Sequence, residues 1–373
     1  MDKNEKNLVL HIITSLGEGG AESVLYKLCA REKSFTHVVV CLTGSGKYSE
    51  MLSAIGVEVY CLGMNPGKIS LPKLGELYAV IKRYRPDVVQ TWMYHSDLIG
   101  GLVARMAGCS VVLWNIRHSV LVSGKTKKST ILVARLCALL SGIIPRYIVC
   151  CAESARKYHA GIGYSNRKMR VIHNGVSLKD FYPVEKKPTM SDRPVIGCVA
   201  RYSADKDHEN LLHALSLLKA RGYEFSCHLI GSGLDKNNLE LVRLINDLHL
   251  GDSVRLLGSQ KNVCGVMNDL DIHVLPSRSE GFPNVLAEAM ACGVPCVSTD
   301  VGDAALIVGN FGWIIEPGNS EKLADGIKQA IEKRSNHDEW MDLKKACRKS
   351  MEDNFDIDGM VASYQNIWKL ALQ

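Results

Sequence analysis

The chain has 373 residues, 46% hydrophobic and 23% charged, which is typical of a soluble globular protein and long enough for two domains. The longest apolar stretch, residues 131–144, is interrupted by Arg135 and is shorter than the roughly 18 residues of a spanning helix. The net charge of +6 is uneven, because residues 1–185 contain 24 Lys and Arg against 13 Asp and Glu. A basic first half favours an anionic partner there. Nucleic acid is not expected, because basic and aromatic residues do not interleave.

The thirteen cysteines are scattered, and several, such as Cys150 and Cys151, lie in apolar runs. Met1 leads almost directly into a short apolar strand, so we expect no signal peptide and a reducing cytoplasm with free, buried thiols. Cys292 and Cys296 are four residues apart, but no second pair or nearby His completes a zinc set.

Short apolar strands alternate with helical patterns along the first half of the chain. Helices are predicted at residues 21–30 and 74–84, the second ending near Pro86. This rhythm is typical of a parallel sheet covered by helices on both faces. The predicted strands are residues 8–13, 38–42, 57–62, 88–91, 111–115 and 147–151.

The polar segment 182–194 contains Pro183 and Pro188 and is predicted to be a linker. The alternation then restarts, which predicts a second doubly wound α/β domain. Its predicted strands are 195–200, 226–230, 254–257, 272–275 and 295–298, and its predicted helices are 209–220, 239–248, 284–291 and 320–333.

These patterns predict an N-terminal Rossmann-like domain at residues 1–185 and a C-terminal one at residues 186–355. Residues 356–373 are predicted to form a helix that packs back on the N-terminal domain. In such tandem folds ligands bind at the carboxyl ends of the strands, so a cleft between the domains is the expected site.

The first candidate site is the loop from Gly17 to Glu22, where Gly19 and Gly20 precede a predicted helix. Glycines there let backbone N–H groups approach an anion, although they also serve tight strand–helix packing. A nicotinamide site is not expected, because residues 40–43 lack the acid that would hold the ribose.

The second candidate site follows the first strand of the second domain, where Arg201 and Lys206 are well placed to hold a diphosphate. Two solvated surface cations are the alternative interpretation.

The third candidate site is the segment from Ser279 to Gly293, in which a strand leads through a loop into a helix. Pro283 suits a first helical turn. Glu280 and Glu288 are eight residues apart, or about 12 Å if helical, so they could grip separate hydroxyl pairs of one ligand. The helix dipole favours Glu280 at the helix start, but it does not explain Glu288.

The segment 279–293 resembles the E-x7-E signature of retaining GT-B glycosyltransferases, and of family GT4 most closely. The resemblance extends over nearly the whole chain and implies two Rossmann-like doubly wound domains facing across a cleft. Its pieces are Gly19-Gly20, Asn115-Ile116-Arg117-His118, Ile172-His173-Asn174-Gly175-Val176, Arg201 with Lys206, Ile230-Gly231-Ser232-Gly233, and Glu280 with Glu288.

The resemblance implies a role for each matching residue. Glu288 would bind the ribose, Glu280 the donor hexose near its 3-hydroxyl, and Arg201 with Lys206 the diphosphate. His118 would face the reacting sugar, a histidine satisfied within its loop being the alternative. The expected catalytic set is His118, Arg201, Lys206 and Glu280, and the expected donor-binding set is Gly19, Gly20, Asn174, Gly231, Gly281, Phe282, Pro283, Asn284 and Glu288.

No metal or other cofactor is expected, because fixed cations can stabilise a leaving diphosphate. Asp269-Leu270-Asp271 looks like the metal clamp of another glycosyltransferase class, but its place before a strand favours a structural role. Asp356-Ile357-Asp358 is interpreted in the same way.

We expect a retaining transferase that moves a hexose or N-acetylhexosamine from a UDP-sugar to a glycan or lipid-linked acceptor in surface polysaccharide synthesis. A non-catalytic sugar-nucleotide-binding protein and a UDP-sugar epimerase of the same fold are the alternatives. The basic residues Lys125, Lys127 and Lys128, followed by the apolar residues 131–134, suggest docking on an anionic membrane at the cytoplasmic face. A core helix with a solvated basic loop is the other interpretation.

Overall fold

The computed structural model describes residues 6–65, 67–68, 70–118, 120–121, 126–184 and 193–373. The chain divides into two compact units: unit 1 comprises Met1–Asn174 and Asp358–Gln373, and unit 2 comprises Gly175–Ile357. The predicted boundary between residues 185 and 186, most of the predicted linker 182–194 and Lys125 lie outside the described residues.

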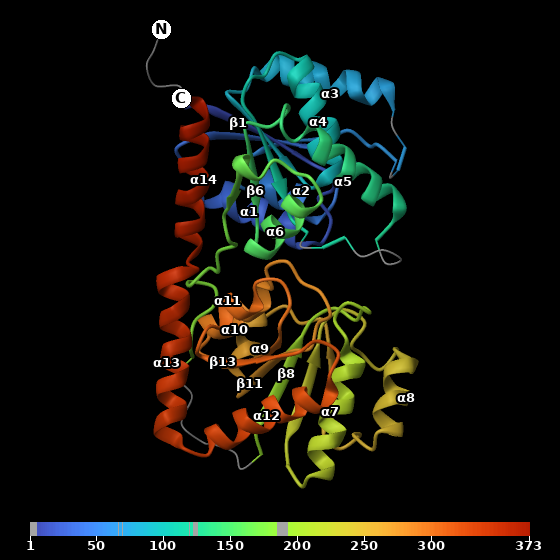
Figure 1. Cartoon of the computed structure of the whole chain (residues 1–373), viewed down its shortest axis with the longest axis vertical. Coiled ribbons are helices and arrows are strands. Elements are labelled where there is room, and N and C mark those ends of the chain that lie inside the picture. Colours follow the sequence, from blue (N-terminus) through green and yellow to red (C-terminus); the bar gives the residue numbers. More distant parts are fainter. Residues whose placement is uncertain (1–5, 66, 69, 119, 122–125, 185–192) are drawn as a thin grey trace. The chain divides into compact units, whose positions relative to one another are not determined.

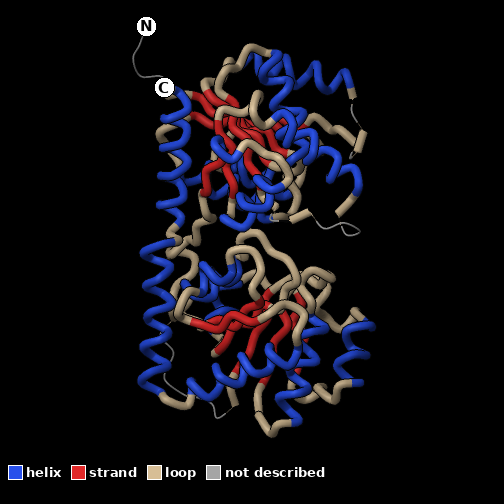
Figure 2. Tube along the Cα trace, viewed as in Figure 1, coloured by secondary structure: helices blue, strands red, loops and turns tan. Residues whose placement is uncertain are grey.

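Unit 1 contains a parallel sheet in the order β3-β2-β1-β4-β5-β6-β7, with helices around it (Figures 1 and 2). Its strands are β1 (Leu8–Ile13), β2 (Thr36–Cys41), β3 (Glu58–Cys61), β4 (Val88–Trp92), β5 (Val112–Ile116), β6 (Tyr147–Cys150) and β7 (Met169–Val171). Its helices are α1 (Gly20–Arg31), α2 (Lys47–Ala54), α3 (Leu71–Tyr84), α4 (Tyr94–Met106), α5 (Lys128–Leu140), α6 (Glu153–Gly161) and α14 (Ile357–Leu372), with a short 3-10 turn at Asn166–Lys168.

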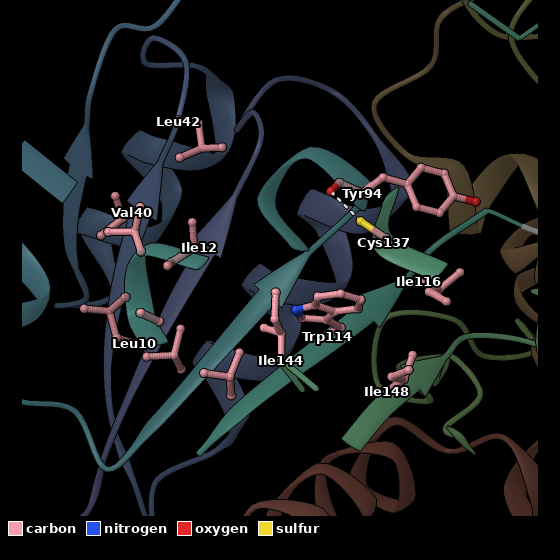
Figure 3. Packing of buried hydrophobic residues seen from close by; sticks show 14 of the residues in the cluster. Leu10, Ile12, Val40, Leu42, Tyr94, Trp114, Ile116, Cys137, Ile144 and Ile148 are labelled. Atoms are coloured by element: carbon pink, nitrogen blue, oxygen red, sulfur yellow. Dashed lines mark hydrogen bonds between the residues drawn. The ribbon is translucent and has the colours of Figure 1, made fainter. Parts of the chain in front are cut away.

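Strands β1, β2, β4 and β5 of unit 1 are buried almost throughout, as strands of a sheet covered on both sides must be. Alternate residues of β1, Leu10 and Ile12, join the core cluster under α3, α4 and α5, part of which is drawn in Figure 3. Trp114 of β5 is completely buried in the same cluster. A Cβ on Gly101 of α4 would lie 2.7 Å from the Trp114 indole nitrogen, so the close approach of α4 to the sheet requires a glycine there.

The C-terminal helix α14 packs within unit 1, although all of unit 2 separates it from the rest of that unit in sequence. The Trp368 indole donates to Gln90 Oε1 at 3.1 Å, and Asn115 donates its amide to the Tyr364 hydroxyl at 2.8 Å. Trp368 and Tyr364 are fully buried. The helix therefore completes the second face of the unit 1 sheet.

A buried hydrogen-bonded chain lies beneath α14. The Trp92 indole donates to His11 Nδ1, His11 Nε2 lies 3.0 Å from His37 Nδ1, and His37 Nε2 lies 2.9 Å from Glu32 Oε2. Burial keeps the pKa of His11 well below its usual value, and the neighbouring His37 adds to this lowering. Cys29 Sγ also lies close to both rings, but each ring nitrogen already has a partner, so no lone pair is left for a metal.

Unit 2 has a second parallel sheet in the order β10-β9-β8-β11-β12-β13. Its strands are β8 (Val195–Val199), β9 (Ser226–Ile230), β10 (Val254–Gly258), β11 (Ile272–Leu275), β12 (Cys296–Thr299) and β13 (Gly312–Ile315). Its helices are α7 (His208–Ala220), α8 (Leu239–Asp247), α9 (Val263–Asn268), α10 (Asn284–Ala291), α11 (Ala304–Val308), α12 (Ser320–Arg334) and α13 (His337–Asn354).

The predicted pair of doubly wound α/β domains is confirmed. The helix predicted at 284–291 begins and ends at the predicted residues, since α10 is Asn284–Ala291. All thirteen cysteines are free thiols, and most of them are buried, as expected. No described helix has both the length and the apolarity needed to cross a membrane.

Candidate active site

The switch point of the unit 2 sheet lies between β8 and β11, which pair with each other although β9 and β10 intervene in sequence. The chain runs from β8 to one side of the sheet and later returns to continue on the other side. Loops at such a point diverge from the carboxyl ends of the strands and leave room for a ligand. Arg201 and Lys206 follow β8, and Glu280 follows β11, so the structure brings the second and third candidate segments to one edge.

A short ion pair joins the two loops at this edge. Lys206 Nζ lies 2.6 Å from Glu280 Oε1, with side chains only 17% and 12% exposed. The Ser277 hydroxyl donates to the same oxygen at 2.7 Å. Partial burial strengthens such a pair relative to a surface one, so the positions of both charges are fixed before any ligand arrives.

Arg201 remains largely exposed, with its guanidinium 4.0 Å from the Asp205 carboxylate. Asp205 also lies 3.8 Å from Lys206 Nζ. Its pKa is lowered: burial opposes the shift, but the nearby Ser203 side chain and the two cations outweigh it. The loop thus holds two cations around one ionised aspartate.

Gly231, in the loop after β9, leaves room for the backbone of the loop after β8. Gly231 has φ +144, and a Cβ there would lie 1.9 Å from the Ala200 carbonyl oxygen. Tyr202 N–H donates to the Ser232 carbonyl at 2.8 Å, which joins the two loops. Gly231 therefore serves the loop that carries Arg201.

The segment 279–293 forms a loop and then helix α10. Pro283 occupies the N-cap position rather than the first helical turn. Phe282 is buried against Phe355, with ring centroids 5.7 Å apart. Glu288 lies on α10 with partial exposure. Because α10 begins only at Asn284, the spacing between Glu280 and Glu288 is not helical throughout, and the 12 Å expectation does not apply.

The Gly281 backbone is fixed by the loop after β12. Its carbonyl accepts from Asp303 N–H at 3.0 Å. A Cβ on Gly302, which has φ +59, would lie 2.2 Å from the same oxygen. Two backbone segments thus touch beside the expected hexose site.

In unit 1 the loop after β1 places Gly19 at the N-cap of α1 and Gly20 at its first residue. Glu22 in the first turn accepts from the Ser15 hydroxyl at 2.8 Å. This loop lies at the switch point of the first sheet, between β1 and β4.

His118 lies beyond the end of β5, next to a hydrogen-bonded pair of rings. Its ring meets Tyr94 edge-on, with centroids 5.6 Å apart. The Tyr94 hydroxyl lies 2.6 Å from His159 Nε2, and His159 Nδ1 lies 2.7 Å from the Ala155 carbonyl. The carbonyl requires Nδ1–H, so Tyr94 is the donor to Nε2. Met93, the residue directly before Tyr94, has φ +72, and this strained backbone conformation lies at the start of α4.

Asn174 is buried, and its side-chain oxygen accepts from the Arg117 guanidinium at 2.6 Å. Arg117 also lies over the Trp92 ring, 5.7 Å from the centroid. The structure thus places Asn174 beside the β5 loop that carries His118.

Sequence reasoning missed several residues of these loops. Arg278 makes a bidentate pair with Asp207, at 2.7 and 2.9 Å, and its N–H donates to the Asp205 carbonyl. Ser277, Tyr94 and Met93 were also missed. A polar residue directly after a predicted strand, as at Ser277, was the available signal; the Asp207–Arg278 pair spans 71 positions and has no local signature.

The two Asp-x-Asp segments have contacts that suit a structural role. Asp271 accepts from Val195 N–H at 2.8 Å and pairs with Arg334 at 3.1 Å. Asp358 pairs with Arg31 at 3.1 Å. The Asp271 carboxylate is therefore engaged on both oxygens and does not fit a metal clamp.

Comparison with known families follows the same division of the chain. The profile of the family Glycosyltransferase Family 4 matches residues 18–180, and that of Glycosyl transferases group 1 matches residues 184–350. The chain belongs to the GT4 family of glycosyltransferases.

Relatives of this GT4 glycosyltransferase include EpsF, a Bacillus subtilis protein classed with the glycosyltransferases, 28% identical over 80% of both chains. An Escherichia coli enzyme named UDP-Gal:alpha-D-GlcNAc-diphosphoundecaprenol alpha-1,3-galactosyltransferase is 23% identical over 80% of this chain and 79% of its own.

Solved structures confirm the GT-B fold. A glycosyltransferase from Rickettsia africae has a TM-score of 0.85 at 20% identity, covering 99% of both chains. Anabaena HepE, crystallised with UDP, has a TM-score of 0.84 at 19% identity, covering 97% of this chain and 99% of its own.

Proposed function

We propose that this glycosyltransferase moves a hexose or N-acetylhexosamine from a UDP-sugar to a lipid-linked or other glycan acceptor in surface polysaccharide synthesis. The reaction takes place in the cytoplasm, with retention and without a metal ion. The observation that carries the proposal is the Lys206–Glu280 pair at 2.6 Å, set at a sheet switch point with Arg201 exposed beside it.

The donor lies along the switch-point edge of unit 2. Glu288 accepts from the ribose hydroxyls, and Glu280 accepts from the hexose near its 3-hydroxyl. Arg201 and Lys206 hold the diphosphate, because guanidinium and ammonium groups bind phosphate oxygens strongly. The backbone of residues 281–284 closes on sugar and phosphate beside the start of α10, where the helix dipole favours negative charge. Gly231 belongs to a unit 2 loop that lines the donor, and Gly19, Gly20 and Asn174 keep the donor-binding role that the family resemblance implies for unit 1.

Charge separates in the transition state, with negative charge on the leaving UDP and positive charge on the sugar ring. Fixed cations stabilise the former, and each lost contact should cost roughly 2 to 4 kcal/mol of barrier. Glu280 and the Ser277 hydroxyl are already in place, so little reorganisation accompanies the reaction.

Retention through front-face attack is supported by the state of Glu280. Both Lys206 and Ser277 bind Glu280 Oε1, and two donors on one oxygen weaken it as a nucleophile. His118 takes a hydrogen-bonding or electrostatic role in unit 1. Proton NMR of the product should show the same anomeric configuration as the donor; an inverted product would defeat this mechanism.

Metal independence is supported by the engagement of Asp271 with Val195 and Arg334. We expect full activity in EDTA. Loss of activity in EDTA with rescue only by a divalent metal would overturn this part of the proposal.

A cavity of about 170 Å³ in unit 1 is the candidate acceptor site. It lies where several strands end and is lined mainly by apolar groups, with Thr14, Thr43 and Lys68 among its polar residues. Relatives whose names specify diphosphoundecaprenol acceptors support a lipid-linked substrate.

The decisive experiment measures UDP release from a panel of UDP-sugars with and without acceptor lipid. Lys206→Met and Glu280→Gln should each lower kcat/KM by roughly 30- to 1,000-fold. The matched controls are Lys322→Met and Glu316→Gln, because this pair has the same 2.6 Å separation but is exposed. Equal activity of all four variants would refute the assignment.

The same assay separates the alternatives. A non-catalytic binding protein would bind UDP-sugar without releasing UDP. An epimerase would release free sugar without any acceptor. The transferase should release UDP faster when acceptor is added and should form a new glycosidic bond, detectable by mass spectrometry.

A further inference from the structure

A second ion pair joins the loops after β8 and β11, beside the pair of Lys206 and Glu280. Arg278 Nε donates to Asp207 Oδ2 at 2.7 Å, and Arg278 Nη2 donates to Asp207 Oδ1 at 2.9 Å. The Arg278 backbone N–H donates to the Asp205 carbonyl at 2.8 Å. Arg278 therefore attaches the loop after β11 to the loop after β8 through three hydrogen bonds.

The conformation of Asp207 favours this link at the expense of local stability. Its backbone lies in the left-handed region, with φ +51 and ψ +47, which is unfavourable for a residue other than glycine. Asp207 is the N-cap of α7, where an aspartate normally accepts from the first helical turn. Its side chain caps none of the described N–H groups of that turn, because both oxygens accept from Arg278. Such departures from local preference are typical of functional sites.

The charges of the two pairs alternate between the loops. The loop after β8 supplies Lys206 and then Asp207, whereas the loop after β11 supplies Arg278 and then Glu280. Exchanged partners would bring Lys206 against Arg278 and leave two carboxylates facing each other, so both contacts would be repulsive. The Asp207 side chain is only 3% exposed, against 49% for Arg278, so its charge requires this partner. The pattern thus favours a single alignment of the two loops.

The pair of Lys206 and Glu280 is the link that a bound donor would weaken. The proposed function gives both of its members to the ligand. The Lys206 ammonium has three N–H donors, so a diphosphate oxygen would share it with Glu280, while a hexose hydroxyl would share the carboxylate. Arg278 and Asp207 hold no part of the donor in that function. Their link therefore keeps its strength when the donor is bound.

We propose that Arg278 is a positioning residue for glycosyl transfer, which keeps the loops after β8 and β11 aligned while the donor is bound. It acts through Asp207 and the Asp205 carbonyl, and the alignment maintains the separation of Lys206 and Glu280. Arginine suits this role, because its planar guanidinium makes two parallel hydrogen bonds that fix an orientation. The assignment deepens the proposed function and rests on it, since the roles of Lys206 and Glu280 come from it.

The test removes both charges of the Asp207–Arg278 pair. Asp207→Asn/Arg278→Gln leaves no unpaired carboxylate, and asparagine tolerates the left-handed conformation. The thermal unfolding midpoint should fall by less than about 4 °C. The kcat/KM for UDP release with acceptor should fall about 10- to 100-fold, because small displacements of catalytic groups are costly. Arg278→Lys should lose less, since it keeps the charge and one hydrogen bond.

A second background separates positioning from direct contact with the donor. In Lys206→Met, the same two changes should lower kcat/KM by less than about threefold, because the charge that the pair positions is gone. The matched control is Arg221→Gln/Asp325→Asn, which removes a pair of the same residue types, 2.7 Å apart, between the end of α7 and α12. This control should release UDP as fast as the native chain.

Hydrogen exchange provides a readout that needs no turnover. The backbone N–H of residue 278 should stay protected in the native chain with and without saturating UDP. In Asp207→Asn/Arg278→Gln it should be protected without UDP, because Lys206 and Glu280 still join the loops. It should exchange at least about tenfold faster once UDP is bound. A merely structural role would speed exchange equally in both states.

Equal losses of kcat/KM in the native and Lys206→Met backgrounds would overturn the proposal, as would exchange that UDP does not alter in the double variant. Failure of the proposed function would look different. Lys206→Met and the native chain would then release UDP equally, and calorimetry of the native chain would detect no binding of UDP.

Discussion

At the scale of single residues, the donor site depends on groups that touch its ligating side chains. Ser277 is fully buried and donates to Glu280 Oε1 at 2.7 Å, while Thr299 Oγ1 donates to the Ser277 carbonyl at 2.6 Å. Ser277 thus orients the carboxylate that Lys206 pairs with, while its own backbone is held by the next strand.

Ser277→Ala should therefore lower kcat/KM by roughly 2- to 13-fold, because one hydrogen bond worth about 0.5 to 1.5 kcal/mol is lost while the ion pair still holds the carboxylate. Steady-state kinetics of UDP release measures this. A loss as large as that of Lys206→Met would contradict the secondary role given to Ser277.

A second prediction concerns the backbone at Gly231. Gly231→Ala should destabilise unit 2 by more than about 2 kcal/mol, because its Cβ would overlap the Ala200 carbonyl in addition to the strain of positive φ. Gly222→Ala is the matched control: Gly222 also has positive φ, +83, but open space around it, so about 1 kcal/mol is expected. Urea unfolding compares the two; equal losses would show that the contact is unimportant.

At the scale of elements, β11 carries an internal pH dependence. His273 is fully buried, and its ring nitrogens have no hydrogen-bond partner within the described parts of the chain. Burial lowers the pKa of His273 to about 3. Below pH 6.5 the unfolded chain binds a proton that the folded strand does not bind, so stability falls as pH falls toward 3.

His273→Leu should remove this contribution, which is roughly 1.4 kcal/mol for each pH unit between about 6.5 and 3. The variant and the native chain should differ little above pH 7, because the replaced ring had no partner to lose. Denaturant unfolding of unit 2 across this range is the measurement. Parallel pH profiles would contradict the assignment.

The sequence predicted most of the individual strands and helix α10 well. Alternating apolar runs located most strands, and α10 matched because Pro283 and the apolar run 285–291 mark its start and extent. Helix α4 was missed, since its N-cap, Met93, has a strained backbone conformation that no residue pattern indicates. For Lys206 and Glu280, the sequence predicted only that each lies in a loop at the end of a strand, and not that they pair. The pairs Arg278–Asp207 and Tyr94–His159 could not be predicted, because they depend on packing between distant segments.

At the scale of the whole molecule, unit 1 is discontinuous and unit 2 is continuous in sequence. Without residues 358–373, the unit 1 sheet would expose Trp92 and leave Gln90 and Asn115 without the partners that Trp368 and Tyr364 provide. The predicted helix at 356–373 is observed as α14, and its partner groups could not be identified without the sheet in place.

The fragment 1–174 should therefore be unstable alone, whereas 1–174 joined by a flexible linker to 358–373 should fold. In the joined fragment, Trp368→Ala should cost about 3 to 5 kcal/mol, as large aromatic truncations in cores do. Near-ultraviolet circular dichroism and urea unfolding measure both effects. A stable fragment 1–174 would show that α14 is dispensable.

The discontinuity of unit 1 also sets an order of events during translation. All residues of unit 2 are made before the sixteen residues Asp358–Gln373 that complete unit 1. The first-made half of the chain is thus finished last, with its apolar sheet face uncovered while the second half is synthesised. Nascent chains stalled before Asp358 should accordingly hold chaperones on residues 6–174 and release them once α14 is made.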